Sequence, residues 1–181
     1  LLHRISDGGL AVVNADDPRI ASLPQNPSAR RVSFGIRRGE IRAEEIQTIG
    51  TEGQRFILAT PKGSIPVQLK ALGQHNIYNA LAACAALLEI VGLELLAEGL
   101  ESFAPYTGRF CLEPLSGNRI LIDDCYNANP ASCAAALQTL QEIRGERRAL
   151  VVLGDMLELG HDEQELHRQL GRQAAQVADR L

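Results

Sequence analysis

Short apolar runs and helix-forming segments alternate over the last third of the sequence, and this alternation limits the possible folds more than any other feature. Residues 119–122 form an apolar run, and a helix is expected after it over about 130–143. Residues 149–153 form a second, uninterrupted apolar run, which we interpret as a strand, and a helix is expected over about 162–177. Strands that alternate with helices predict a parallel sheet with right-handed crossovers, so we expect an α/β fold.

The first part of the chain contains several further strand candidates. Residues 10–14 and 31–35 are short apolar runs, and residues 41–49 are expected to be extended. Residues 55–60 and 64–69 flank Pro61-Lys62-Gly63, which predicts a hairpin. Because proline cannot donate a ladder hydrogen bond, Pro66 indicates an edge strand.

An alanine- and leucine-rich segment then predicts a helix over 76–91. Ile77, Leu81, Cys84 and Leu88 recur at helical spacing and are expected to face the core. Gly92 is a plausible helix end, and a second helix is expected over 95–103. Residues 104–108 read as a linker and a candidate domain boundary.

The composition excludes several classes of protein. The 181 residues are 45% hydrophobic and 22% charged, with a net charge of −4, so nothing favours binding to nucleic acid or to an anionic membrane. The apolar runs are too short to span a bilayer, and no signal-peptide pattern opens the chain. The four cysteines show no C-x-x-C spacing, which favours reduced thiols over a zinc site.

Polar residues are concentrated where the run 119–122 ends. Asp123, Asp124, Tyr126, Asn127 and Asn129 precede the expected helix. In open parallel sheets, ligands bind outside the carboxyl ends of the strands, and a carboxylate there can accept both hydroxyls of a ribose. The alternative is that these side chains only cap the turn and the helix.

A second polar loop, Leu-Gly-Asp-Met-Leu-Glu-Leu-Gly at 153–160, follows the run 149–153 in the same way and brings Asp155 and Glu158 to the same sheet edge. Its two glycines would allow close backbone approach. An ordinary loop with a helix cap is the alternative.

The third cluster is Gly-Gln-His-Asn-Ile-Tyr-Asn-Ala at 73–80. Asn76 and Asn79 are three residues apart, so they share one face of a helical turn. An amide side chain can match the donor and acceptor on an adenine edge. Alternatively, Asn76 is an N-cap, Asn79 is solvated, and His75 is a structural hydrogen-bonding residue.

Arg109 follows Gly108 at the candidate boundary. An arginine there can make bidentate, charge-assisted hydrogen bonds with a phosphate. Alone, it reads as an ordinary surface arginine.

Taken in order, the motifs resemble those of the Mur ligase family of peptidoglycan synthesis. The motifs are Asn-Ala-Asp-Asp-Pro at 14–18, the segment 73–80, Gly-Arg at 108–109, Asp-Asp-Cys-Tyr-Asn-Ala-Asn-Pro at 123–130 and the segment 153–160. The resemblance is strongest to the branch that adds D-alanyl-D-alanine. It implies a cytoplasmic, ATP-dependent ligase that uses Mg²⁺ and joins D-alanyl-D-alanine to UDP-N-acetylmuramoyl-tripeptide through an acyl phosphate.

The resemblance also implies roles for individual residues. Asn76 and Asn79 would hold the adenine, Asp124 the ribose, and Arg109 the ATP phosphates as the catalytic residue. Substrate contacts are expected from Tyr126, Asn127 and Asn129.

The implied organisation is the end of a central P-loop-type ATPase domain, residues 1–106, followed by the first half of a Rossmann-like, parallel-sheet C-terminal domain, residues 107–181. The sequence holds no G-x-x-x-x-G-K-[ST] motif, so we expect an internal fragment of a longer enzyme, with the magnesium ligands upstream. Two alternatives are a related ligase, such as another Mur ligase or a folylpolyglutamate synthase, and a non-catalytic nucleotide-binding module.

Overall fold

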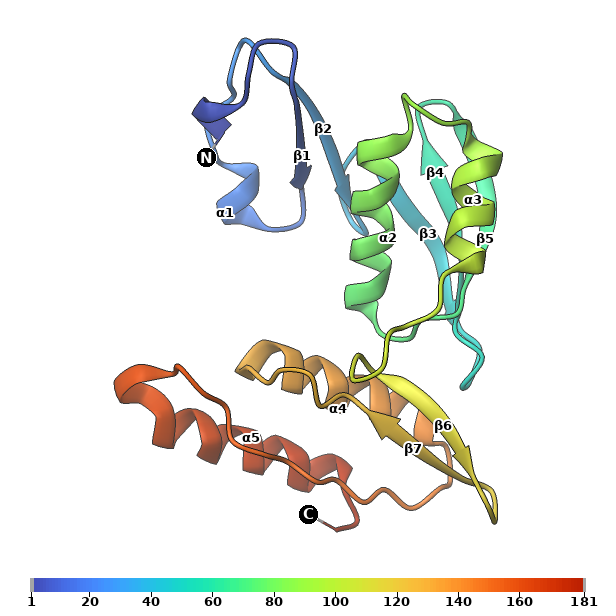
Figure 1. Cartoon of the computed structure of the whole chain (residues 1–181), viewed down its shortest axis with the longest axis vertical. Helices are drawn as coiled ribbons and strands as arrows, with labels where there is room; N and C mark the ends of the chain where they lie inside the picture. The colour runs from blue at the N-terminus through green and yellow to red at the C-terminus, as the bar shows by residue number, and fades with distance from the viewer. Residues whose placement is uncertain (1, 181) are drawn as a thin grey trace. The chain divides into compact units, whose positions relative to one another are not determined.

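The structure is a computed structural model that describes residues 2–180 (Figure 1). The chain divides into two compact units. The first unit takes in the residues up to Gln47 together with Gln54–Lys70 and His75–Phe103. The second unit consists of Thr48–Gly53, Ala71–Gln74 and the residues from Ala104 onward.

The elements of the first unit are, in chain order, η1 (Leu2–Arg4), β1 (Leu10–Asn14), α1 (Pro18–Ala21), β2 (Arg30–Gly35), β3 (Ile41–Thr48), β4 (Gln54–Thr60), β5 (Gly63–Leu69), α2 (Gln74–Leu87) and α3 (Leu93–Ser102). The five strands form one sheet in the order β1-β2-β3-β4-β5. β1 pairs with β2 and β2 with β3 in parallel, while β4 and β5 form an antiparallel hairpin. The expected α/β class is therefore confirmed. The parallel pairs lie in this first unit, however, and not between residues 119–122 and 149–153, for which parallel pairing was expected.

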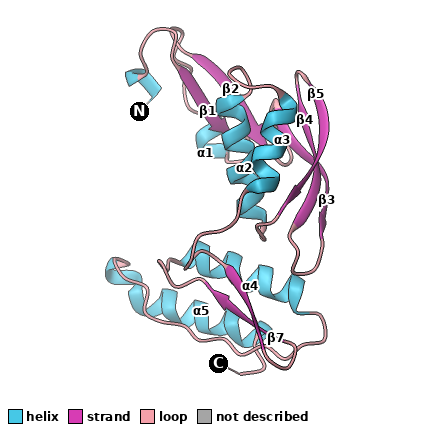
Figure 2. Ribbon diagram, turned by 45° about the vertical axis from the view of Figure 1, so that its right-hand side comes forward, coloured by secondary structure: helices cyan, strands magenta, loops and turns pink. Residues whose placement is uncertain are grey.

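The helices α2 and α3 lie on one face of this sheet (Figures 1 and 2). The expected stripe of Ile77, Leu81, Cys84 and Leu88 is buried against it, and burial raises the pKa of the Cys84 thiol to about 11. Pro66 lies in β5, which is an edge strand as expected.

The helix boundaries differ from the expectation around Gly92. α2 ends at Leu87, and Gly92 is the N-cap of α3 instead of the end of the preceding helix. Its extended backbone, with φ −70° and ψ 165°, starts the new helix. Glycine is accepted at both ends of helices, so the sequence alone does not separate the two roles.

The second unit contains β6 (Cys111–Leu115), β7 (Arg119–Asp123), α4 (Pro130–Arg144), η2 (Gly160–Asp162) and α5 (Glu163–Val177). β6 and β7 form an antiparallel hairpin that sequence reasoning missed. α4 and α5 pack side by side (Figure 2) around a core that contains Leu137, Met156, Leu170, Ala174 and Val177.

The strand expected over residues 149–153 is not formed. One isolated parallel bridge joins Leu150 to Arg180, and the Val152 side chain is 87% exposed. Within residues 2–180, β7 pairs with β6 instead of with this segment. A strand requires a ladder of hydrogen bonds to a neighbour, and apolar composition alone does not supply one.

Candidate functional site

Two loops of the second unit are tied together by hydrogen bonds. One loop, residues 107–110, precedes β6, and the other, residues 123–129, follows β7. Asp123 accepts a hydrogen bond from the main-chain N–H of Gly108 (3.0 Å), and Asp124 accepts one from that of Phe110 (3.1 Å). The N–H of Tyr126 donates in return to the Gly108 carbonyl (3.1 Å). The two carboxylates therefore hold the backbone on both sides of Arg109.

The Asp123 carboxylate is stabilised in its ionised form. The Cys125 thiol lowers the pKa of Asp123, partial desolvation opposes this, and the N–H groups of Cys125 and Gly108 lower it further. The same contact raises the pKa of Cys125 above its ordinary value. Cys125 is therefore a thiol that donates to a carboxylate, not a reactive thiolate.

Arg109 lies over the ring of Tyr126. Its guanidinium carbon is 4.0 Å from the ring centroid, within the range of a cation–π contact. Gly108 permits this approach, because it has a φ of +77° and a Cβ there would lie 3.2 Å from the Tyr126 Cβ. Arg109 and Tyr126 are both exposed, so the charge faces solvent, where a phosphate could reach it.

The remaining polar side chains of the loop bond locally. Asn129 and Ser132 form a capping box at the start of α4, and Pro130 occupies its first turn. The Asn127 side chain accepts a hydrogen bond from the N–H of Ala128 (2.9 Å). The capping interpretation is thus confirmed for Asn129.

Asn76 and Asn79 lie in the first unit, in the first turns of α2. The Asn79 amide donates to the Asn76 side-chain oxygen (3.3 Å), so the two share one helix face as expected. Asn76 is not the N-cap, because α2 already begins at Gln74. The His75 ring lies 3.2 Å from the Asn76 amide, as expected for a structural hydrogen-bonding residue.

Asp16 and Tyr78 are polar residues of the first unit that sequence reasoning did not single out. The Tyr78 hydroxyl, on α2, donates to the Asp16 carboxylate (2.8 Å), just after β1. The signal was present, since Asp16 lies inside the Asn-Ala-Asp-Asp-Pro motif and Tyr78 lies between the two asparagines.

Comparison with known proteins identifies both halves of the chain. Residues 1–87 match the Mur ligase middle domain, and residues 108–181 match the domain described as Mur ligase, glutamate ligase domain. The UDP-N-acetylmuramoyl-tripeptide–D-alanyl-D-alanine ligase of Escherichia coli is 36% identical over 174 residues, which is 94% of this chain and 38% of that protein. The chain belongs to the Mur ligase family.

Solved structures of Mur ligases share the fold. The structure of MurF from Acinetobacter baumannii superposes with a TM-score of 0.85 at 36% identity, covering 95% of this chain and 37% of that one. The MurF ligase of Thermotoga maritima, solved in complex with ADP, has a TM-score of 0.73 at 22% identity and covers 93% of this chain and 38% of that one. This Mur ligase chain therefore spans little more than a third of the length of these relatives.

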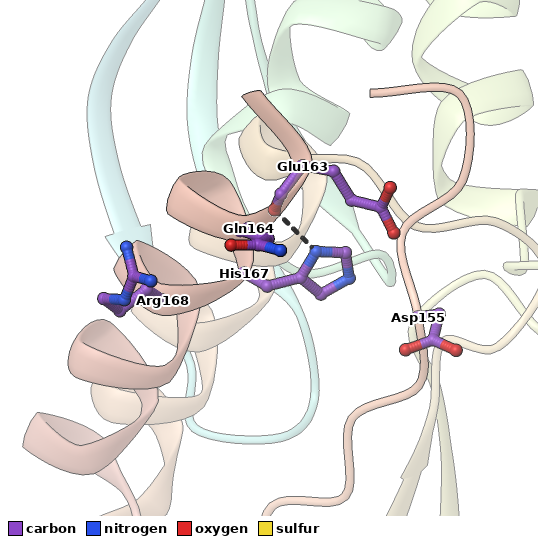
Figure 3. A pocket seen from close by; sticks show the side chains of 5 residues that line it. All are labelled: Asp155, Glu163, Gln164, His167 and Arg168. Atoms are coloured by element: carbon purple, nitrogen blue, oxygen red, sulfur yellow. Dashed lines mark hydrogen bonds between the residues drawn. The ribbon is translucent and has the colours of Figure 1, made fainter. Parts of the chain in front are cut away.

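The loop 153–160 of this Mur ligase is held by α5. The Nε2 atom of His167 accepts a hydrogen bond from the Met156 N–H (3.0 Å), and its Nδ1 atom lies 2.8 Å from the Glu163 carbonyl. These bonds fit the neutral ring with its proton on Nδ1. Asp155 and His167 line a shallow, open pocket (Figure 3), together with Glu163, Gln164 and Arg168.

The backbone at the two glycines of this loop is not crowded by other described residues. A Cβ at Gly154 or Gly160 would meet no atom within 4 Å. Gly160 has a φ of +66°, a left-handed conformation that favours glycine over other residues. Nothing in the structure explains the glycine at position 154. Glu158 is exposed and lies outside the pocket-lining set.

Residues 2–180 contain neither a metal-binding cluster nor a membrane-spanning helix. No group of three or more His, Cys, Asp or Glu side chains is arranged to hold a metal ion there. No helix in that range is long and apolar enough to cross a membrane.

Proposed function

We propose that this chain is part of an ATP-dependent ligase that adds D-alanyl-D-alanine to UDP-N-acetylmuramoyl-tripeptide in the synthesis of peptidoglycan precursors. The similarity to a ligase of that name over 94% of the chain is the observation that carries the proposal. We expect the reaction to take place in the cytoplasm, where ATP is available. Residues 1–106 would be the end of the ATP-binding middle domain, and residues 107–181 the beginning of the C-terminal domain.

The chemistry of each side chain supports the proposed nucleotide-binding roles. Asn76 and Asn79 present amide donors and acceptors on one helix face, which suits the edge of adenine. Asp124 stands in the loop after β7, where a carboxylate can accept from the ribose hydroxyls. Mg²⁺ would neutralise phosphate charge when bound, and residues 2–180 do not offer a cluster of side chains to hold it.

Arg109 would neutralise charge during the transfer of the phosphoryl group and the loss of phosphate. A guanidinium is permanently charged and matches two phosphate oxygens at once. Its stacking on Tyr126 limits the directions in which it can point, which reduces the entropy lost when it binds. Tyr126, Asn127 and Asn129 would line the path of the peptide substrates.

Phosphate release by the full-length protein tests this proposal. With ATP, Mg²⁺ and UDP-N-acetylmuramoyl-tripeptide, D-alanyl-D-alanine should stimulate release, whereas D-glutamate, diaminopimelate and folate with glutamate should not. Arg109→Ala should abolish the stimulation and the surface variant Arg172→Ala should preserve it. Stimulation by one of the other amino substrates would assign the protein to a related ligase, and no release with any of them would contradict the proposal.

A further inference from the structure

The carboxylate of Asp16 connects three segments of the first unit. Its Oδ2 atom accepts from the main-chain N–H groups of Ile36 (2.6 Å) and Arg37 (3.0 Å), and its Oδ1 atom accepts from that of Arg38 (2.9 Å). Oδ2 also accepts from the Tyr78 hydroxyl (2.8 Å). One side chain thereby joins the end of β1, the turn between β2 and β3, and the first half of α2.

The backbone around Asp16 is shaped to allow these contacts. A Cβ at Gly35 would lie 2.8 Å from the Asp16 carboxylate oxygen and 2.3 Å from the Arg38 carbonyl, so the carboxylate reaches the turn only past a glycine. The Asp16 N–H in turn donates to the side chain of Asn14 (2.9 Å), which fixes its direction. Only a side chain with two acceptor oxygens at position 16 can accept all of these hydrogen bonds.

Tyr78 links this cluster to the proposed adenine site. It lies between Asn76 and Asn79 on α2, and those two amides are bonded to each other (3.3 Å). Because helix backbone is stiff along one turn, fixing the Tyr78 hydroxyl limits both the rotation of α2 about its axis and its translation along it. The two amides are then held in a defined orientation relative to the sheet.

We propose that Asp16 and Tyr78 are positioning residues that orient Asn76 and Asn79 for recognition of the adenine base. This inference rests on the proposed function, because it takes the two asparagines as the adenine contacts. Asp16 and Tyr78 touch each other, not the nucleotide, and act through the helix that carries the amides.

The ionisation states favour a persistent contact. Partial burial would raise the pKa of Asp16, but the three N–H groups and the Tyr78 hydroxyl together hold it below its ordinary value. Desolvation, followed by the hydrogen bond to Asp16 and its charge, raises the pKa of Tyr78 to about 12. At neutral pH the pair is therefore a phenol that donates to a carboxylate, a charge-assisted hydrogen bond.

The test measures nucleotide selectivity in the full-length protein. Adenine and guanine present opposite groups beside N7, a donor in one and an acceptor in the other, so misoriented amides should lose their preference for ATP over GTP. Tyr78→Phe removes only the hydroxyl and should raise the KM for ATP about three- to tenfold with little change in kcat, as expected for one lost hydrogen bond. The ratio of kcat/KM for ATP to that for GTP should fall by a similar factor.

Matched controls separate positioning from general destabilisation. Tyr106→Phe removes an exposed hydroxyl, and Asp17→Asn alters the neighbouring carboxylate, which caps α1. Neither should change the ATP to GTP ratio. Asp16→Asn should change it in the same direction as Tyr78→Phe. The double variant should change the ratio little further, because both substitutions act on the ratio through the same Asp16–Tyr78 contact.

Three results would overturn the inference, and the first two differ in what they say about the proposed function. If Asn76→Ala and Asn79→Ala raise the KM for ATP while Tyr78→Phe leaves KM and selectivity unchanged, only the positioning role fails. If the two asparagine variants also leave the KM for ATP unchanged, the adenine assignment fails with it. A fall in melting temperature and kcat at unchanged selectivity would reduce Tyr78 to a purely structural residue, which also overturns the inference.

Discussion

Arg109 combines exposure with a fixed direction, a combination that suits a residue whose partner arrives from solvent. Its guanidinium lies 4.0 Å from the centre of the Tyr126 ring, and the backbone on both sides of it is bonded to carboxylates. The charge is thus available without the freedom of an unsupported surface arginine. The sequence indicated the residue through its place after Gly108, but not the ring that supports it.

Removal of this charge should affect turnover more than binding. In the full-length protein, Arg109→Ala should lower kcat about 100- to 1000-fold, because the guanidinium matters most as negative charge develops on the transferred group. The dissociation constant for ADP should rise by a smaller factor. Steady-state assays measure kcat and calorimetry measures the dissociation constant for ADP, with Arg172→Ala as the control. Equal factors of change in kcat and in ADP affinity would contradict the assigned role.

We expect the adjacent carboxylates of Asp123 and Asp124 to have different functions. Asp123 uses both oxygens to accept from the N–H groups of Gly108 and Cys125 (3.0 and 3.3 Å), so Asp123→Asn should mainly lower the melting temperature. Asp124→Asn should mainly weaken nucleotide binding, because an amide oxygen accepts less strongly than a carboxylate from ribose hydroxyls. Thermal unfolding and ADP titration of both variants test this. If Asp124→Asn lowered the melting temperature more and Asp123→Asn weakened ADP binding more, the two roles would be exchanged.

At the scale of elements, α4 starts at a residue with two possible roles. Asn129 caps α4 through a reciprocal hydrogen-bond pair with Ser132, with distances of 2.9 and 3.1 Å. Asn129→Ala should lower the free energy of unfolding by about 1 kcal/mol, the usual cost of a lost cap, whereas Asn129→Ser should retain most of it. If Asn129 also contacts the peptide substrate, Asn129→Ser will still raise the KM for D-alanyl-D-alanine. Unchanged KM in both variants would limit Asn129 to capping.

The elements that the sequence predicted well are those with a local cause. The stripe of Ile77, Leu81, Cys84 and Leu88 repeats at helical spacing, and Pro61-Lys62-Gly63 joins two short apolar runs. Each pattern determines its element without reference to distant residues.

The elements that were misjudged depend on distant partners. Residues 149–153 have the composition of a buried strand, but their one bridge is to Arg180, so pairing and not composition decides their state. The Asp16–Tyr78 contact joins residues 62 positions apart, and its parts are ordinary until the fold brings them together. Ring stacking by Arg109 was missed for the same reason, because Tyr126 belongs to another loop.

At the scale of the whole molecule, the Asp16 network should contribute to acid sensitivity. Because the pKa of Asp16 is below its ordinary value of 3.8 in the folded state, its contribution to stability is fully present above that value. The contribution is lost as the pH falls through the lowered folded value. In urea unfolding, Asp16→Asn should therefore be less stable than the parent at pH 7, and the difference should shrink towards pH 2; a constant difference would show that ionisation of Asp16 is irrelevant.

The boundary between the two units should be open to proteolysis. Residues 103–106 form no regular structure, and Tyr106 is 78% exposed. Tyr126, the other strongly exposed tyrosine, is restrained by its N–H bond to Gly108 and by Arg109. Because proteases cut flexible, exposed chain first, brief treatment of the full-length protein with chymotrypsin should cleave after Tyr106 and create a new N-terminus at Thr107.

That cut would fall at the proposed domain junction, between residues 106 and 107, in the interval that separates the two matched family domains. Mass spectrometry of the early fragments identifies the site, and Tyr106→Ser should delay cleavage there without changing later cuts. If each unit keeps its own core, both fragments will resist further digestion over the same period. First cleavage within β1 to α3 or within α4 or α5 would contradict the assignment of the junction, because those elements carry the cores of the two units.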